Sequence, residues 1–191
     1  MDYSFLPYLE GLSSNWFDDD DFLMSCVSRE RHDALHRWGA LAATRLKALA
    51  DESELPENRP RLVHFGAYNR RIDDVVLPSS TREALRLTHG GKLGFVGPDA
   101  RAHYAAIYLV NQNAEAGVAC SLACTNGMER ALRKFAGAPA LDSARALIAS
   151  STPERFTHGA QFVSEIQGGC DVAANAVIAK PDAGGPWRLF G

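Results

Sequence analysis

The sequence contains no hydrophobic run that approaches the roughly 18 residues of a membrane-spanning helix. Its first residues, MDYSFLPYLEG, also lack the basic start and long apolar middle of a signal peptide. The sequence also has no large excess of one charge, because 20 Lys and Arg against 23 Asp and Glu leave a formal net charge of only −3. This balance gives no electrostatic reason to expect a nucleic acid or an anionic membrane as partner. We therefore expect a soluble, cytoplasmic protein.

Cysteine is scarce, with only Cys26, Cys120, Cys124 and Cys170 in 191 residues. A chain of this length with 46% hydrophobic residues can bury a core without disulfides, and a reducing compartment keeps the four as thiols. Cys120 and Cys124 are four residues apart in a helical pattern, but no second pair of metal ligands stands near them. We therefore expect small thiols in the core and no metal site.

Hydrophobic residues recur every three or four positions in several segments, which is the spacing of amphipathic helices. The longest run extends from Arg29 to about Asp51 and should stop before Pro56. Further helices are predicted from 79–81 to 87, from 97–99 to 113, from 116 to 135 and from 141 to 149. The second of these is apolar nearly all round, so we expect a buried helix with Tyr104 and Tyr108 in the core.

Two clusters of potential metal ligands are interpreted as surface features. The four acids at 18–21 follow an irregular N-terminal stretch and are expected to form a solvated helix start, where negative charge meets the positive end of the helix dipole. The sequence HDALH at 32–36 is superficially similar to a zinc-protease motif, but an Asp replaces its Glu and no third ligand is evident. Residues 62–78, after a loop, are predicted to be extended or irregular.

The sequence period changes after Phe156. Residues 160–164 and 172–180 are predicted to be strands, the latter rich in Val, Ile and small residues, and 187–190 begins a third strand after a turn at 181–186. Three strands cannot close a barrel, so the sheet is expected to be incomplete at Gly191. The sequence thus predicts a mainly α chain with a helical domain at 1–156 and the start of a β-domain at 157–191.

The segment SEIQGGCD at 164–171 joins the first two predicted strands. Gly168 and Gly169 can adopt conformations closed to other residues, and a side-chain-free loop with several backbone N–H groups suits a phosphate. Ser164 would point its hydroxyl at such a ligand, and Asp171 could order the loop by accepting backbone donors. A plain hairpin connection explains the same residues, so the pattern alone leaves both interpretations open.

The chain resembles the acyl-CoA dehydrogenase superfamily. In that family an N-terminal helical domain leads to a small β-domain whose first strand carries the pattern T/S-E-x-x-x-G-S-D, and here a helical region is followed by AQFVSEIQGGCDV and a hairpin ending in WRLFG. The resemblance is strongest to the adaptive-response AidB-like branch, through NRRIDDV, EAGVACSLACT and SEIQGGCDV. It is specific over 160–191 and looser over 20–155.

This resemblance implies FAD as the cofactor. Ser164 would hydrogen-bond the pyrimidine edge of the flavin, and Cys170 stands where the family usually has a serine that contacts the pyrophosphate. A thiol is a weaker donor than a hydroxyl, so that contact should be poorer here, although backbone amides could still serve. Glu165 would shape the loop. The implied cofactor-binding residues are Phe162, Val163, Ser164, Gly169, Cys170 and Asp171.

The family's catalytic carboxylate belongs to a C-terminal helical domain that has no counterpart in this sequence. Glu115 and Glu129 lie on predicted helices, and neither has a visible reason to become a base of raised pKa. We therefore expect no catalytic residue here, but the N-terminal portion of an FAD-dependent acyl-CoA dehydrogenase-like oxidoreductase. It would be inactive alone, with weak or absent FAD binding. The complete protein would dehydrogenate acyl-CoA-type thioesters as a homo-oligomer or with a complementing subunit.

Three alternatives stay open. The chain could be a non-catalytic assembly or binding module whose unfinished strands offer an edge for pairing. An alkylation-response protein associated with DNA is disfavoured by the acidic charge balance. The small residues Gly117, Ala119, Ser121 and Ala123 of the predicted helix 116–135 could leave room for an acyl chain or simply allow close helix packing.

Overall fold

A helical run from Arg29 to Glu54 forms the first long element of the computed structural model, which describes residues 4–93, 98–113, 115–135, 137–148, 157–182, 185 and 187–191. It consists of a 3₁₀ turn at Arg29–Arg31, α3 (His32–Leu41), a π-helical turn at Ala42–Leu46 and α4 (Lys47–Glu54). Leu35, Leu46 and Leu49 are buried along one side. The predicted helix is confirmed, and it ends before Pro56 as expected.

The N-terminal stretch is more regular than its sequence predicts, with helices α1 (Leu6–Leu12) and α2 (Asp21–Cys26). The expected helix start among the acids is confirmed, because the Asp20 carboxylate accepts the backbone N–H of Leu23 at 2.7 Å. The indole N–H of Trp16 donates to the carbonyl oxygen of Gly11 at 3.1 Å. Such capping and tertiary contacts hold helices that are too short to show a hydrophobic period.

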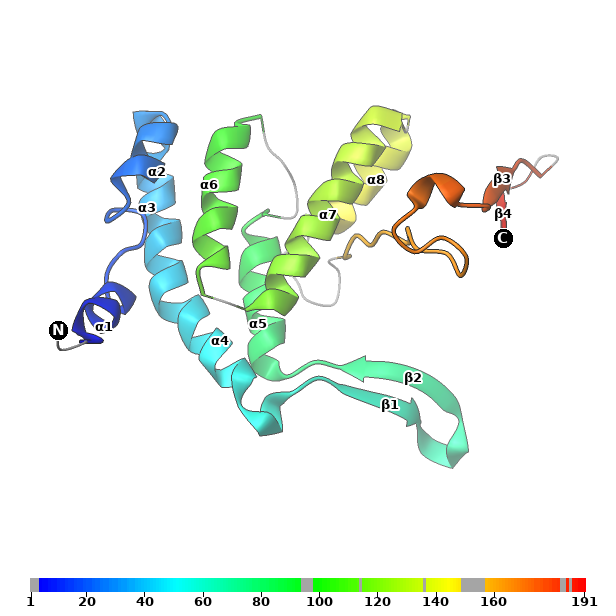
Figure 1. Cartoon of the computed structure of the whole chain (residues 1–191), viewed down its shortest axis with the longest axis horizontal. Coiled ribbons are helices and arrows are strands. Elements are labelled where there is room, and N and C mark those ends of the chain that lie inside the picture. Colours follow the sequence, from blue (N-terminus) through cyan, green and yellow to red (C-terminus); the bar gives the residue numbers. More distant parts are fainter. Residues whose placement is uncertain are drawn as a thin grey trace. The chain divides into compact units, whose positions relative to one another are not determined.

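Residues 61–76 form an antiparallel hairpin of β1 (Arg61–Phe65) and β2 (Arg71–Val76), which extends away from the helices of its unit (Figure 1). The predicted extended conformation is confirmed, but the turn was missed. Tyr68 and Asn69 both adopt φ of 58°, the left-handed conformation that hairpin turns require. Gly66 opens this connection, but the two left-handed positions are occupied by Tyr68 and Asn69 and not by a glycine.

Four further helices complete the helical part: α5 (Ser79–Gly90), α6 (Ala100–Asn111), α7 (Ala116–Phe135) and α8 (Ala138–Ile148). α3 packs against α6, α4 against α5, and α7 against α5, α6 and α8. Asp99 caps α6 by accepting the N–H of Ala102 at 3.1 Å. The core contains Phe17, Leu35, Ala42, Leu46, Leu85, Leu109, Val110, Val118 and Leu122.

The outer side of α6 departs from the expected burial. Tyr104 and Tyr108 keep 41% and 49% of their surface exposed, so their assignment to the core was wrong. With Phe22, Leu23 and Cys26 of α2 they line an open, mainly apolar hollow of about 580 Å³. The tyrosine hydroxyl reaches polar groups at the edge of such a hollow, and that of Tyr104 accepts a hydrogen bond from Arg130 at 3.0 Å.

The C-terminal strands are shorter than predicted. Residues 160–165 have no regular secondary structure, Val172–Ala174 form a 3₁₀ turn, and only β3 (Ile178–Lys180) and β4 (Arg188–Phe190) pair, in antiparallel register. A strand needs a partner for its backbone groups, and within the described residues none lies beside 160–164. The predicted strand there was wrong for this reason.

The chain divides into two compact units, Met1–Ala160 and Gln161–Gly191. The predicted domain boundary at Phe156 and the predicted helix end at Ala149 lie outside the described residues. A mainly helical fold with few short strands confirms the predicted fold class. Across the portion described, no helix combines the length and the apolar character that crossing a membrane requires.

Candidate functional site: the diglycine loop

Glu165 closes the SEIQGGCD segment onto the residues that follow it. Its carboxylate accepts the backbone N–H groups of Ala176 at 2.6 Å and Val177 at 3.1 Å, and the side-chain amide of Gln167 at 2.5 Å. The hydrogen bond from Ala176 is the largest cause that holds the pKa of Glu165 below its ordinary value. The loop-shaping role expected for Glu165 is therefore what this geometry shows.

The two glycines serve different purposes in the loop. At Gly168 an added Cβ would lie 3.0 Å from the side-chain oxygen of Asn175, whose amide donates to the carbonyl oxygen of Val163 at 2.9 Å. Gly169 has φ of +50° and no atom within 4 Å of an added Cβ. The missing side chain at Gly168 makes room for the Asn175 side chain, which holds the carbonyl oxygen of Val163. The missing side chain at Gly169 leaves open space beside the loop.

Two backbone amides of the loop have no acceptor among the described residues. The N–H of Gly168 donates to the carbonyl oxygen of Glu165 at 3.1 Å, and that of Asp171 donates to the carbonyl oxygen of Gly168 at 3.0 Å. The N–H groups of Gly169 and Cys170, which lie between them, have no protein acceptor within the described residues. Two adjacent amides without a protein acceptor, beside a glycine, suit an anionic oxygen.

The six residues predicted to contact a cofactor all lie in this one segment, and all are exposed: Phe162, Val163, Ser164, Gly169, Cys170 and Asp171. Phe162 is 99% exposed, and Ile166, which sequence reasoning missed, is 106% exposed. The carboxylate of Asp171 makes no capping hydrogen bond at the turn that follows it, so its expected ordering role was wrong and belongs to Glu165. Large exposed apolar side chains beside amides without a protein acceptor form a surface that a flat, phosphate-bearing ligand could cover.

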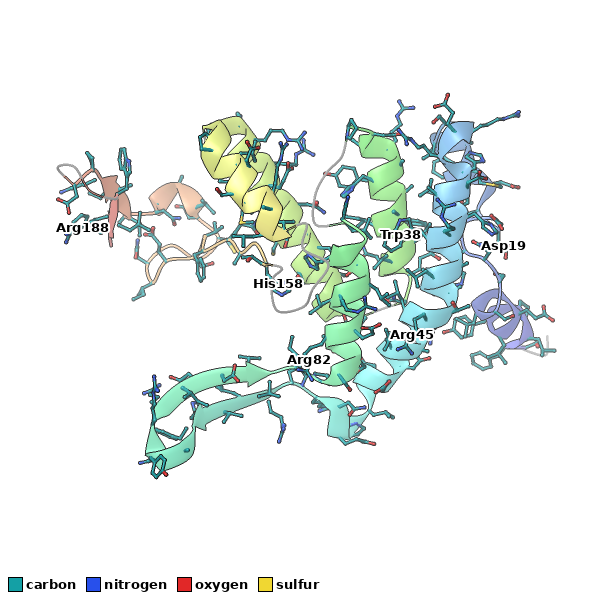
Figure 2. The ribbon with its side chains drawn as sticks, turned by 180° about the vertical axis from the view of Figure 1, so that it is seen from behind. Asp19, Trp38, Arg45, Arg82, His158 and Arg188 are labelled. Carbon is teal, nitrogen blue, oxygen red and sulfur yellow. The ribbon has the colours of Figure 1, made fainter. Side chains whose placement is uncertain are left out.

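A second polar group lies within the helical unit, between α5, α7 and residue 158 (Figure 2). Nε2 of His89 is 3.1 Å from the hydroxyl of Ser121, and the same hydroxyl also contacts Nδ1 of His158. The two imidazole rings meet edge to face with centroids 5.2 Å apart. No sequence motif marked these three residues, because they come from separate elements.

Burial keeps this histidine pair neutral. It lowers the pKa of His89 to about 4, with a smaller contribution from the charge of His158, and it lowers the pKa of His158 as well. Two imidazolium ions at this separation would also repel each other. At neutral pH the cluster is therefore an uncharged hydrogen-bonded link between helices.

The lowered pKa of His89 predicts that stability falls with pH below neutrality. The unfolded chain binds a proton near pH 6.5 and the folded chain only near pH 4, so stability present at pH 7 is lost as the pH falls between these values. We expect the free energy of unfolding to fall by about 2 kcal/mol from pH 7 to pH 5, measured by urea denaturation. His89→Gln should remove most of this slope, and an unchanged slope in that variant would contradict the assignment.

The two acidic residues considered as potential bases have structural roles. The carboxylate of Glu115 accepts the N–H of Val118 in the first turn of α7. Glu129 is fully buried and pairs with Arg133 at 2.6 Å and Arg145 at 3.4 Å. Both carboxylates take part in structural contacts, and the expectation that neither acts as a base stays a prediction.

The cysteines are not core residues. Cys120 and Cys170 are exposed, Cys26 and Cys124 are half-buried, and the expectation of buried thiols was wrong. Cys26 lines the hollow beside α6, and Cys120 and Cys124 lie on the surface of α7. Among the described residues, no group of three or more His, Cys, Asp or Glu is arranged to hold a metal ion.

Comparisons with known proteins identify relatives of this architecture. The family model of the adaptive response protein AidB N-terminal domain matches residues 9–152. The solved structure of Bd2924 in its apo form is similar over 93% of this chain, with a TM-score of 0.77 and 26% identity. Caenorhabditis elegans ACDH-11, solved in complex with C11-CoA, shares the fold over 93% of this chain, with a TM-score of 0.74 and 21% identity. The chain spans 39% and 33% of the length of these two proteins. No curated protein matches the sequence.

Proposed function

This chain belongs to the AidB N-terminal domain family within the acyl-CoA dehydrogenase superfamily, and we propose from that membership that it contributes part of an FAD site in an acyl-CoA dehydrogenase-like assembly. The observation that supports the proposal is the open side of the diglycine loop. There the N–H groups of Gly169 and Cys170 have no acceptor among the described residues, and nothing lies within 4 Å of a Cβ added at Gly169. Such a cradle fits the pyrophosphate of a dinucleotide.

The proposed division of labour within the loop follows from its geometry. Gly169 and Cys170 would bind the pyrophosphate, while Phe162, Val163 and Ser164 would contact the flavin ring with apolar surface and one hydroxyl. Glu165 would hold the loop open through its bonds to Ala176 and Val177. When bound, the flavin supplies the acceptor for a hydride from an acyl thioester, and this chain orients it and covers one side from water.

The proton acceptor is proposed to come from a partner. In the described residues Glu115 and Glu129 are both engaged in structural contacts. We therefore propose that dehydrogenation of acyl-CoA-type substrates requires a complementing subunit or a larger homo-oligomer, that the chain alone is inactive, and that it acts in the cytoplasm. α7, with the small residues Gly117 and Ala123 at its surface, is the proposed wall for the acyl chain.

FAD titration tests the loop. Gly169→Val places a branched side chain at φ of +50° beside the two amides without a protein acceptor, so we expect at least tenfold weaker FAD binding, followed by flavin fluorescence and equilibrium dialysis. Cys170→Ser restores a stronger donor and should tighten binding about three- to tenfold. Gly11→Ala, in α1 with open space around it, is the matched control and should leave binding unchanged. Equal binding by all these chains would refute the proposed cradle.

A second candidate, an assembly module, is favoured by the hairpin. A two-stranded hairpin is marginally stable by itself, yet both faces of this one carry exposed apolar side chains. The exposed residues are Leu62, Phe65, Tyr68, Ile72 and Val75. An assembly function would appear as a concentration-dependent increase in mass by light scattering that Leu62→Glu abolishes.

A further inference from the structure

Two cysteine side chains lie one turn apart on the surface of α7. Cys120 is exposed and Cys124 is half-buried in an uninterrupted helix, Ala116–Phe135. Burial is the largest cause that raises the pKa of the Cys124 thiol, and a hydrogen bond with the Cys120 thiol adds to it. The spacing of four residues in α7 places the two thiols on the same face of the helix.

Access is open at Cys120. The positions three or four residues away from Cys120 along α7 are Cys124 and three small, exposed residues, Ala116, Gly117 and Ala123. Beside Cys124, Gly127 is small and exposed, whereas Ser121 and Met128 are half-buried. Because side chains at i and i+4 share a helix face, both sulfur atoms face the same approaching ligand.

The geometry of a helix separates two possible uses of such a pair. Side chains four residues apart have Cβ atoms about 5–6 Å apart. A disulfide needs Cβ atoms about 3.5–4.5 Å apart, so a bond between Cys120 and Cys124 would distort the helix. Two thiolates on one metal ion, with metal–sulfur bonds of about 2.3 Å, can stand up to about 4.6 Å apart and fit without distortion. The two cysteines are therefore suited to chelate one metal ion and unsuited to form a disulfide with each other.

We propose that Cys120 and Cys124 form a binding site for a single soft monovalent ion, Cu(I), on the surface of α7. Thiolate sulfur selects Cu(I) over hard cations. Zn(II) is disfavoured, because it takes four protein ligands in structural sites and the described residues offer no third or fourth His, Cys, Asp or Glu here. On binding, each thiol gives up its proton, so that one Cu(I) and two thiols yield an anionic dithiolate complex and two protons. This site shares no residue with the proposed flavin loop, which belongs to the other unit, but it borders Gly117 and Ala123 of the proposed acyl wall.

The test is anaerobic competition for Cu(I) against the coloured chelator bathocuproine disulfonate, with the reduced full-length chain. The C26S/C170S variant retains only the proposed pair and should bind one Cu(I) with the affinity of the natural sequence. Cys120→Ser or Cys124→Ser leaves a single thiolate and should weaken binding about 100-fold or more, because the second bond is no longer intramolecular. Uptake should release two protons per ion into a weakly buffered solution.

Each outcome decides the proposal. Retention of tight, stoichiometric Cu(I) by C120S/C124S would overturn it, as would Zn(II) held as tightly as Cu(I) by the C26S/C170S variant. Circular dichroism and the thermal midpoint check that the variants fold. If Cys124→Ser prevents folding because Cys124 is half-buried, the Cu(I) affinity of the Cys120→Ala variant alone decides the proposal. Cys120 is exposed, so its removal leaves the packing unchanged.

Discussion

Replacing Arg133 and Arg145 together by alanine is expected to lower the free energy of unfolding by about 3–5 kcal/mol. Both guanidinium groups contact the carboxylate of Glu129, at 2.6 and 3.4 Å, and the Glu129 side chain is fully buried between α7 and its neighbours. Without the two arginines, folding would bury an uncompensated charge. Urea denaturation at neutral pH, followed by circular dichroism, measures the loss.

The order of the unfolding free energies of further variants tests this explanation. The arginine side chains keep 44% and 33% of their surface in water, so Glu129→Gln alone should cost less than the double alanine variant. Adding Glu129→Gln to R133A/R145A should recover part of the loss, because the buried charge is then gone. Arg130→Ala is the matched control, because Arg130 lies on the same helix and, within the described residues, its hydrogen bond goes to the hydroxyl of Tyr104. A triple variant that is less stable than the double variant would contradict this account.

Gly159→Ala is expected to cost about 3 kcal/mol of unfolding free energy. The added Cβ would lie 2.7 Å from Cα of Thr125 and 2.8 Å from the carbonyl oxygen of Cys124. These are backbone atoms inside a helix, which cannot turn aside as a flexible side chain can. The segment of residue 159 would have to move out and would lose the hydrogen bond from its N–H to the Thr125 hydroxyl, now 3.0 Å long.

Two control variants distinguish steric crowding at residue 159 from the other effects of the substitution. Gly11→Ala meets no atom within 4 Å inside α1 and should be neutral or stabilising by up to about 1 kcal/mol, as expected for a helix interior. Thr125→Val removes the hydroxyl but keeps the volume, so it isolates the loss of the hydrogen bond. A Gly159→Ala variant as stable as the natural sequence, in thermal and urea unfolding alike, would show that residue 159 does not pack this closely on α7.

The helices could be read from the sequence where a single buried side repeats over many turns. The apolar positions of α7 recur at three or four residues, and its predicted bounds agree with the structure at both ends. The run from Arg29 was found for the same reason. In both cases burial of one face dominates the energetics, and that burial leaves a period in the sequence.

Other elements depend on contacts that leave no period. α1 and α2 are held by a cap and by a side-chain hydrogen bond that spans five residues, and the left-handed positions of the hairpin turn are Tyr68 and Asn69 and not a glycine. Residues 160–164 have a high strand propensity, but they form no strand because no neighbouring strand pairs with them in the described residues. The side of α6 that carries Tyr104 is apolar yet open, since aromatic residues occur in cores and at exposed surfaces alike.

The internal bonds of the candidate loop could not be predicted from the sequence. Two adjacent glycines between apolar segments marked the loop, and the assignment of six of its residues to cofactor binding stays a prediction. That Glu165 and not Asp171 shapes the loop depends on N–H groups eleven and twelve residues further along the chain. The histidine pair joined by Ser121 depends on helix packing, which a single sequence does not reveal.

The π-helical turn at Ala42–Leu46 lets the continuous helical run from Arg29 to Glu54 pack against two different helices. The N–H of Lys47 reaches back five residues to the carbonyl oxygen of Ala42, so the turn holds one residue more than a regular α-helix. That surplus residue rotates everything beyond it by about 100° around the axis. The first half can thus face α6 while the second half faces α5. Excising one residue here would straighten the hydrogen-bond ladder and point Leu49 at water.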